Sequence, residues 1–237
     1  MKGIKGLLLD LDGTLVDIKV SFFLDTMMES MVDYFIALLD PETFRRGLIG
    51  SIDELISSPR SSGETNQDGF YDAFFRLTGL SPEAAQQGFD AYYRDVFPGF
   101  SEYGSYVDGA LDLIESAHER GFALALATNP IFPRAAVLER MSWGNLSPDP
   151  FTFIAALENT RACKPQIEFF TAVADALDLH PEQCLMVGND VAHDLAASSA
   201  GMRTYLAEPH LVREDASGNV PDGRGLLRDL GRTLGLW

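Results

Sequence analysis

The feature that most constrains this chain is the stretch LLLDLDGTLVD, residues 7–17, in which an apolar run ends in two aspartates, Asp10 and Asp12. Side chains two positions apart on a strand point to the same face, and open α/β sheets bind ligands at the carboxyl ends of their strands. Two carboxylates this close repel each other unless a cation or a shared proton offsets their charge. Gly13 can adopt a positive φ and turn the backbone away, which leaves both side chains exposed. The stretch therefore predicts a nucleophilic, metal-binding carboxylate site.

The second half of the chain alternates between amphipathic patterns of helical period and short apolar runs. We expect helices at 107–121, 133–141, 165–179, 193–201 and 225–237, and strands at 122–128, 151–157, 184–188 and 203–208. This alternation is typical of a parallel sheet with helical crossovers. The fold predicted is α/β, with a doubly wound, Rossmann-like parallel sheet.

The region between the first strand and residue 107 has a different character. It contains helical patterns such as FFLDTMMESMVDYFIALL and FYDAFFRL but no convincing strand, and the polar run at 57–69 predicts a loop. We therefore expect an inserted all-α domain at 17–100, with the α/β core formed by 1–16 and 101–237. The two boundaries fall at about residues 16 to 20 and 97 to 105.

Three further polar motifs follow apolar runs, as Asp10 follows the first. In ALATNP, the hydroxyl of Thr128 can donate to a phosphate oxygen, although a lone threonine there also suits a helix cap or turn. In RACKPQIEFF, Lys164 precedes a predicted helix, where its ammonium group and nearby amides could hold a phosphate. Lys164 is the only lysine after Lys19, so a merely solvated surface lysine is the less attractive interpretation.

The last motif, LMVGNDVAHDLAASSAGM, carries Asp190 and Asp194 just after an apolar run. A spacing of four residues places both on one face of a helix. Carboxylate oxygens suit Mg²⁺, which usually binds one or two protein carboxylates together with water and substrate phosphate. Helix N-capping could explain either acid alone. Four such motifs in this order are much harder to explain as unrelated turns and caps.

In sequence and spacing, the four motifs resemble the signatures of the haloacid dehalogenase superfamily, whose hydrolases mostly cleave phosphate esters. The resemblance implies a helical cap inserted between the first and second signatures, and it implies that Asp10 attacks phosphorus to form an aspartyl-phosphate. Asp12 would first protonate the leaving oxygen and later activate water. Mg²⁺ would be bound by the Asp10 carboxylate, the Asp12 backbone carbonyl and Asp190, while Thr128, Asn129 and Lys164 would hold the phosphate.

The chain departs from the commonest form of the family at Asn189, where an acid usually follows the glycine. We expect Asp190 to be the direct metal ligand, with Asn189 and Asp194 supporting it through hydrogen bonds or water. The alternative, in which Asn189 occupies the ligand position, stays open at this point.

Composition restricts the partners. A net charge of -17 repels nucleic acid and anionic membrane surfaces, and no segment is apolar for long enough to span a membrane. Two cysteines, Cys163 and Cys184, are too few for a disulfide framework, so we expect free thiols in a reducing cytoplasm. The expected partner is a small phosphate ester. The sequence predicts neither its identity nor an oligomeric state.

Two alternative functions remain. Dehalogenases and phosphonate-cleaving members of the family lack an acid at the position of Asp12, but a phosphosugar mutase would keep it. Residues 15–100 carry six basic and fourteen acidic side chains, which weakens the case for a mutase that holds a bisphosphate. A binding or regulatory protein could also retain the fold without turnover. We favour a phosphomonoester hydrolase whose helical insertion closes as a lid and selects the leaving group.

Overall fold

The core of the protein is a parallel sheet covered by helices on both faces. The computed structural model describes residues 3–18, 20–208, 211–212, 218 and 220–237. Six parallel strands lie in the order β5-β4-β1-β6-β7-β8, with β1 and β6 at the centre. The strands are β1 Gly6–Leu9, β4 Ala123–Leu126, β5 Phe153–Ile154, β6 Cys184–Gly188, β7 Arg203–Ala207 and β8 Gly223–Gly225. This arrangement confirms the predicted α/β fold with a doubly wound sheet.

The two faces of the sheet bury separate apolar clusters. Leu7 and Leu9 of β1 point to one cluster and Leu8 to the other, as the alternation of side chains along a strand requires. On the Leu7 face lie α5 (Ala110–Glu119), α6 (Arg134–Trp143) and α8 (Leu227–Leu234). On the Leu8 face lies α7 (Ile167–Ala176), together with the short 3₁₀ helix η3 (Leu195–Ala200). A further 3₁₀ turn, η2 (Pro181–Gln183), precedes β6.

Several element bounds differ from those predicted. The region 193–201 forms a 3₁₀ helix rather than an α-helix, because backbone hydrogen bonds there join residues three apart, such as Ala197 to Asp194. Strand β5 is only two residues long, and α7 begins after Pro165 rather than at it. The sheet also has a sixth strand, β8, in a stretch for which no strand is predicted. Its residues GRG pair with β7 through the backbone and give no apolar signal.

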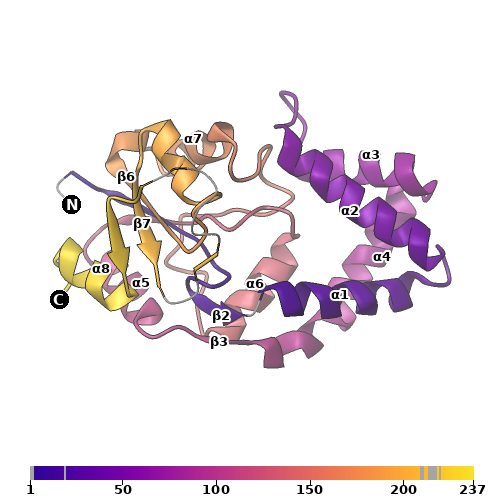
Figure 1. Ribbon diagram of the computed structural model, residues 1–237, viewed down its shortest axis with the longest axis horizontal. Coiled ribbons are helices and arrows are strands. Elements are labelled where there is room, and N and C mark those ends of the chain that lie inside the picture. Colours follow the sequence, from indigo (N-terminus) through magenta and orange to yellow (C-terminus); the bar gives the residue numbers. More distant parts are fainter. Residues whose placement is uncertain (1–2, 19, 209–210, 213–217, 219) are drawn as a thin grey trace.

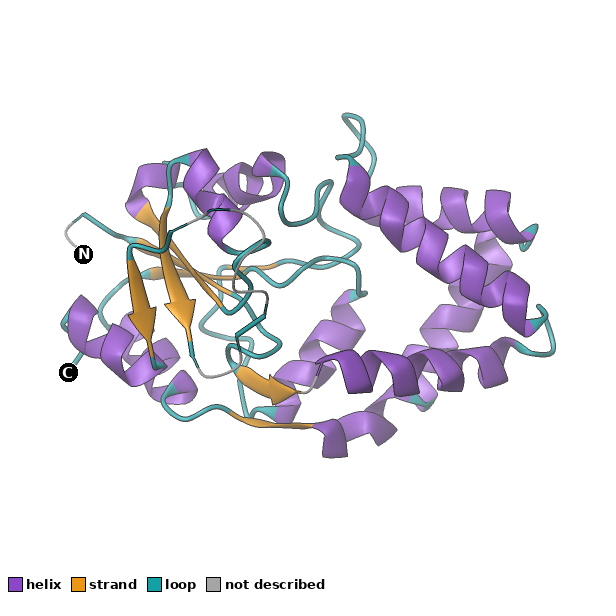
Figure 2. Ribbon diagram, viewed as in Figure 1, coloured by secondary structure: helices purple, strands orange, loops and turns teal. Residues whose placement is uncertain are grey.

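The region between β1 and α5 is almost entirely helical. It contains α1 Val20–Phe35, α2 Pro41–Ser57, α3 Asn66–Thr78, α4 Pro82–Asp95 and the 3₁₀ helix η1 Phe97–Tyr103. Figure 2 shows these helices grouped at one end of the molecule and the sheet at the other. None of the helices in the described parts of the chain has the length and apolarity needed to cross a membrane.

Aromatic rings form the interior of the helical region. Phe35 stacks on Phe44 with ring centroids 4.8 Å apart, and Phe89 lies 4.8 Å from Phe35 and 5.4 Å from Phe74. All four are buried. Residues Asp40 and Ser81 cap α2 and α4, each followed by a proline at the first helical position. The insertion therefore has its own aromatic core.

Two short strands join the helical region to the core. Strand β2 (Val16–Ile18) pairs antiparallel with β3 (Gly104–Tyr106), so the prediction that this region lacks strands is wrong at its two ends. Both strands are too short to give an apolar alternation. They lie near the predicted boundaries (Figure 1), and the division into a core of 1–16 and 101–237 and a cap of 17–100 stays a prediction.

A second attachment lies at the beginning of α3. The first backbone N–H groups of this helix, at Asn66 and Gln67, donate to the carbonyl oxygens of Thr160 and Leu157 in the core, at 2.7 and 2.9 Å. The amide nitrogen of Asn66 also lies 3.0 Å from Thr160 Oγ1 and 3.2 Å from the Ala162 carbonyl oxygen. Asn66 is fully buried. Helix N–H groups that would otherwise lack partners thus bind the cap to the core.

Replacing Asn66 should therefore weaken the cap attachment measurably. We expect Asn66→Ala to lower the free energy of unfolding by about 2 to 3 kcal/mol, because it removes hydrogen bonds and leaves buried core acceptors without their donor. Urea denaturation measures the change. The control is Gln87→Ala, an exposed amide on α4, which should change stability by less than about 0.5 kcal/mol. Equal stabilities of the two variants would contradict this account of the attachment.

Candidate active site

All eight residues that the sequence singles out line one cavity of about 530 Å³ at the carboxyl ends of the central strands. Asp10 follows β1, Thr128 lies just beyond β4, and Asn189 follows β6. Because β4, β1 and β6 are parallel neighbours, their ends meet at the same edge of the sheet. The eight residues are Asp10, Asp12, Thr128, Asn129, Lys164, Asn189, Asp190 and Asp194.

Lys164 forms the centre of the charge network. Its Nζ lies 2.7 Å from Asp10 Oδ1 and 2.6 Å from Asp194 Oδ1, and all three side chains are buried. Burial alone would lower the pKa of Lys164, but the two carboxylates outweigh it and hold this pKa above its usual range. Burial raises the pKa of Asp10 to about 6, although Lys164 acts in the opposite direction. The ammonium group therefore stays charged between two carboxylates.

Two polar side chains support this network. Thr14 Oγ1 donates to Asp10 Oδ2 at 3.1 Å and lies 3.3 Å from Asn189 Oδ1. Asn129 Oδ1 accepts the backbone N–H of Lys164 at 3.2 Å and so holds the loop before α7. The amide nitrogen of Asn129 carries the donors that a phosphate oxygen would need. Thr14 belongs to the first motif, but no role in the site was predicted for it.

The two acids of the last motif have different surroundings. The Asp194 side chain is only 1% exposed; its Oδ2 accepts the backbone N–H of Asp190 at 2.9 Å, while its Oδ1 faces Lys164. The Asp190 side chain is 18% exposed and accepts from the backbone N–H groups of Ala192 and His193, with His193 Nδ1 2.8 Å away. Burial raises the pKa of Asp190, but the hydrogen bonds from His193 and Ala192 outweigh it and lower this pKa overall. Asp190 is therefore an ionised carboxylate that solvent can reach.

Gly188 provides the space that Asp194 occupies. A Cβ at position 188 would lie 2.1 Å from Asp194 Oδ2 and 2.2 Å from its carboxyl carbon. Gly188 ends β6, so the strand and the turn after it can approach this closely only without a side chain. Gly188 is therefore needed for the Asp194 side chain to occupy this position.

Arg140 is a site residue that was not predicted from the sequence. It lies on α6 with its side chain 1% exposed, and its Nη1 forms an ion pair with Asp12 Oδ2. The guanidinium carbon lies 4.2 Å above the ring of Phe132. A signal exists in hindsight: Arg140 falls on the buried face of α6, four residues after Ala136 and three after Val137, where a charged residue needs a partner.

The pairing with Arg140 controls the environment of Asp12. Burial raises the pKa of Asp12, and Arg140 opposes that rise. In the described part of the chain, Asp12 Oδ1 and Arg140 Nη2 are buried and have no hydrogen-bond partner. One oxygen of Asp12 is therefore held by the arginine, while the other is left for a ligand.

The donor set of the cavity suits a magnesium ion. Four acids, Asp10, Asp12, Asp190 and Asp194, share the cavity with two cations, Lys164 and Arg140, so these six side chains carry two net negative charges when all four acids are ionised. Within the described residues, no group of three or more His, Cys, Asp or Glu side chains gathers around a single point. A hard cation held by one or two carboxylates, a backbone carbonyl and water fits both observations.

Comparison with known proteins identifies relatives over most of the chain. It is 28% identical to pyrophosphatase PpaX of Halalkalibacterium halodurans over 218 residues, which cover 90% of this chain and 87% of that protein. It is 25% identical to the chloroplastic protein SUPPRESSOR OF QUENCHING 1 of Arabidopsis thaliana over 229 residues. That match covers 92% of this chain but only 20% of the much longer plant protein.

The fold of this chain is also found in solved structures. The crystal structure of a HAD phosphatase from Thermococcus onnurineus aligns with a TM-score of 0.63 and 19% identity, and the alignment covers 98% of each chain. The sequence signature of the haloacid dehalogenase-like hydrolases matches residues 4–201, which include every site residue described above. The chain therefore belongs to the haloacid dehalogenase-like hydrolase family.

Proposed function

We propose that the protein hydrolyses phosphate monoesters of small metabolites through an aspartyl-phosphate on Asp10. The observation that carries the proposal is the arrangement of Asp10 between Lys164 and Thr14 at the carboxyl edge of the sheet, with Asp12 two residues further along. Thr14 and Lys164 hold the two oxygens of Asp10 in fixed directions. A carboxylate oriented in this way is suited to in-line attack on phosphorus.

The reaction proceeds in two steps. Asp10 forms a bond to phosphorus while the bond to the leaving oxygen breaks, and Asp12 gives its proton to that oxygen. Asp12 then takes a proton from water, which attacks the aspartyl-phosphate, releases phosphate and restores Asp10. The raised pKa of Asp12 supports its role as an acid. Thr128, Asn129 and Lys164 bind the phosphoryl oxygens.

Mg²⁺ is the cofactor proposed for this site. The Asp10 carboxylate, the Asp12 backbone carbonyl and the Asp190 carboxylate would hold it. When bound, the ion neutralises the negative charge shared by the site and the substrate phosphate. The greater exposure of Asp190 supports it as the direct ligand, and the burial of Asp194 against Lys164 supports a role in orienting that lysine.

The structure favours a hydrolase over a mutase. A mutase acting on a bisphosphate needs a second group of phosphate-binding residues, usually basic ones, on the cap. Among the described residues, those of the region 17–100 that line the catalytic cavity are apolar, Ile18, Phe23 and Leu24. We also propose that the helical region, residues 17–100, acts as a lid that excludes water from Asp10 during the first step.

The nucleophile is tested directly by Asp10→Asn. We expect this variant to lose phosphatase activity by at least about a thousandfold, because an amide does not attack phosphorus, while the change in volume is too small to disturb the fold. Activity is measured with acetyl phosphate, and folding by circular dichroism. A folded variant with turnover like that of the wild type would exclude Asp10 as the nucleophile.

Metal dependence separates the roles of Asp190 and Asn189. We expect EDTA to remove activity and Mg²⁺ to restore it. Asp190→Asn should raise the Mg²⁺ concentration needed for half-maximal activity by at least about tenfold, whereas Asn189→Ala should raise it far less. Titration of each variant with Mg²⁺ gives the comparison, and the reverse ranking would assign the ligand position to Asn189.

Arg140 is proposed as a positioning residue for the acid Asp12. We expect Arg140→Met to lower kcat about tenfold or more for alkyl phosphates but much less for p-nitrophenyl phosphate, whose leaving oxygen needs little protonation. The variant should also lose about 3 kcal/mol of stability, because Asp12 is then a buried charge without its partner.

The double variant provides the decisive comparison for Arg140. In the Arg140→Met background, Asp12→Asn should recover part of the lost stability, as expected for two members of one ion pair. Arg134→Met, at the exposed beginning of the same helix, should leave kcat and stability nearly unchanged. An equal loss of kcat for both classes of ester would show that Arg140 does not act through Asp12.

A further inference from the structure

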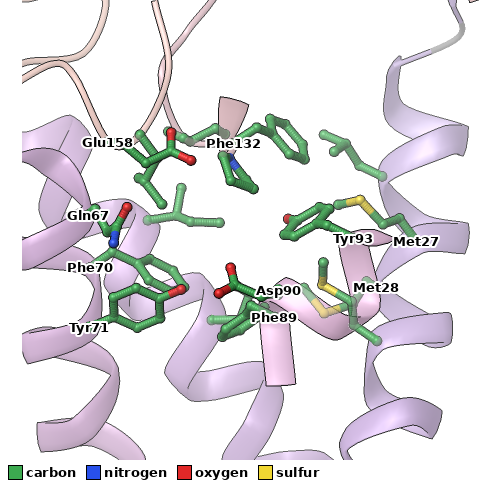
Figure 3. A pocket seen from close by; sticks show the side chains of 17 residues that line it. Met27, Met28, Gln67, Phe70, Tyr71, Phe89, Asp90, Tyr93, Phe132 and Glu158 are labelled. Carbon is green, nitrogen blue, oxygen red and sulfur yellow. The ribbon is translucent and has the colours of Figure 1, made fainter. Parts of the chain in front are cut away.

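A second cavity, of about 200 Å³, lies inside the helical region against the core. Helices α1, α2, α3 and α4 form its sides, and the core loops at 131–133 and 157–158 close it. The lining is mostly apolar, with methionines from α1 and aromatic rings from α3 and α4, including Met28, Phe70 and Phe89 (Figure 3). The catalytic roles proposed above use none of these side chains.

This cavity adjoins the catalytic one. Leu24, Ile131 and Phe132 line both, so the two spaces share part of their walls. Phe132 also lies under the guanidinium group of Arg140, which pairs with Asp12. The inner cavity therefore reaches Phe132, whose ring contacts Arg140, the partner of the proposed acid.

The polar groups of the inner cavity are acidic or neutral. Asp90 of α4 and Glu158 of the core loop face it from opposite sides, and Tyr71 and Tyr93 also line it (Figure 3). Burial, reinforced by Asp90 and Glu158, raises the pKa of Tyr71. The two oxygens of Glu158 each lie 2.9 Å from the backbone N–H of Arg134, which fixes this carboxylate in place.

The charge of the cavity follows from this lining. Among its seventeen described lining residues there is no lysine, arginine or histidine. Asp90 and Glu158 are both solvent-exposed residues, and with no basic residue in the described lining their two carboxylates produce a negative potential at the cavity. A second anionic group on a ligand would be repelled there, and a cation would be attracted.

We propose that this cavity binds the leaving group of the substrate and selects a ring-sized apolar alcohol that is neutral or cationic. The assignment rests on the phosphatase function proposed above. An engineered cavity of about 150 Å³ with an apolar lining holds one benzene molecule, so the present space accommodates roughly one substituted six-membered ring. The phosphate of such an ester lies at Asp10, and its alcohol passes Phe132 into the helical region.

The test compares three esters that differ only far from the phosphate. They are 2-phenylethyl phosphate and its para-aminomethyl and para-carboxyl derivatives, whose leaving oxygens have nearly the same basicity. We expect kcat/KM for the aminomethyl ester to equal or exceed that of the parent, and that of the carboxyl ester to be at least tenfold below that of the aminomethyl ester. Acetyl phosphate, which is too small to reach the inner cavity, reports on the catalytic site alone.

Two variants connect the preference to the cavity. Asp90→Asn should reduce the ratio between the aminomethyl and carboxyl esters at least threefold while changing the parent ester by less than twofold. Asp95→Asn, an exposed acid on the same helix that does not line the cavity, should leave the ratio unchanged. Met28→Trp fills the space and should lower kcat/KM at least fivefold for all three esters but less than twofold for acetyl phosphate.

The outcomes separate the two proposals. Hydrolysis of acetyl phosphate together with equal rates for the three esters, or with a preference for the carboxyl ester, overturns the assignment of the cavity and leaves the phosphatase function standing. The same holds if Met28→Trp is folded, as judged by circular dichroism, and cleaves the ring-bearing esters normally. Failure of the wild type to hydrolyse acetyl phosphate or any of the three esters with Mg²⁺ present overturns the phosphatase proposal, and the cavity assignment with it.

Discussion

The buried ammonium group of Lys164 is the interaction on which the rest of the site depends. It lies between Asp10, at the end of β1, and Asp194, beyond the end of β6, with 2.7 and 2.6 Å separating the charged atoms. Removing three charged groups from water is costly unless they are paired and hydrogen-bonded, so each of these side chains requires the other two. The network thereby joins two neighbouring strand ends to the loop before α7, and it places the nucleophile at a defined point on the edge of the sheet.

The sequence predicted the parts of the protein that are encoded locally. An apolar run followed by a polar motif marks both a buried strand and the chemistry at its end, so β1, β4 and β6 and the acids or hydroxyls that follow them could be placed together before the structure was known. The structure brings all eight predicted residues into one cavity, while the chemical roles assigned to them stay proposals. Gly188 belongs to the same local pattern, because the packing of Asp194 against the strand leaves no room for a side chain.

Features that depend on distant contacts could not be predicted in this way. Arg140 is separated by 128 residues from Asp12, and nothing near it in sequence indicates the carboxylate that it meets. Asn66 is an ordinary polar residue in sequence, and it binds the core only because α3 begins against the loop at 157–162. The short strands β2, β3 and β8 depend on backbone pairing with partners elsewhere in the chain, so their side chains carry little pattern. Each of these features becomes visible only when the fold brings the partners together.

Phe132 links the two cavities mechanically. Its ring forms part of the wall of the inner cavity and also supports the guanidinium group of Arg140 from below, at 4.2 Å. A group that packs against this ring restricts its rotation, and a ring held still in turn restricts the arginine and the carboxylate beyond it. An occupied inner cavity would therefore order the acid at Asp12, whereas a small acyl phosphate such as acetyl phosphate would not contact the ring. Substrates would then be distinguished by how well they position the carboxyl group of Asp12, as well as by how tightly they bind. A poorly fitting ester would be bound but cleaved inefficiently.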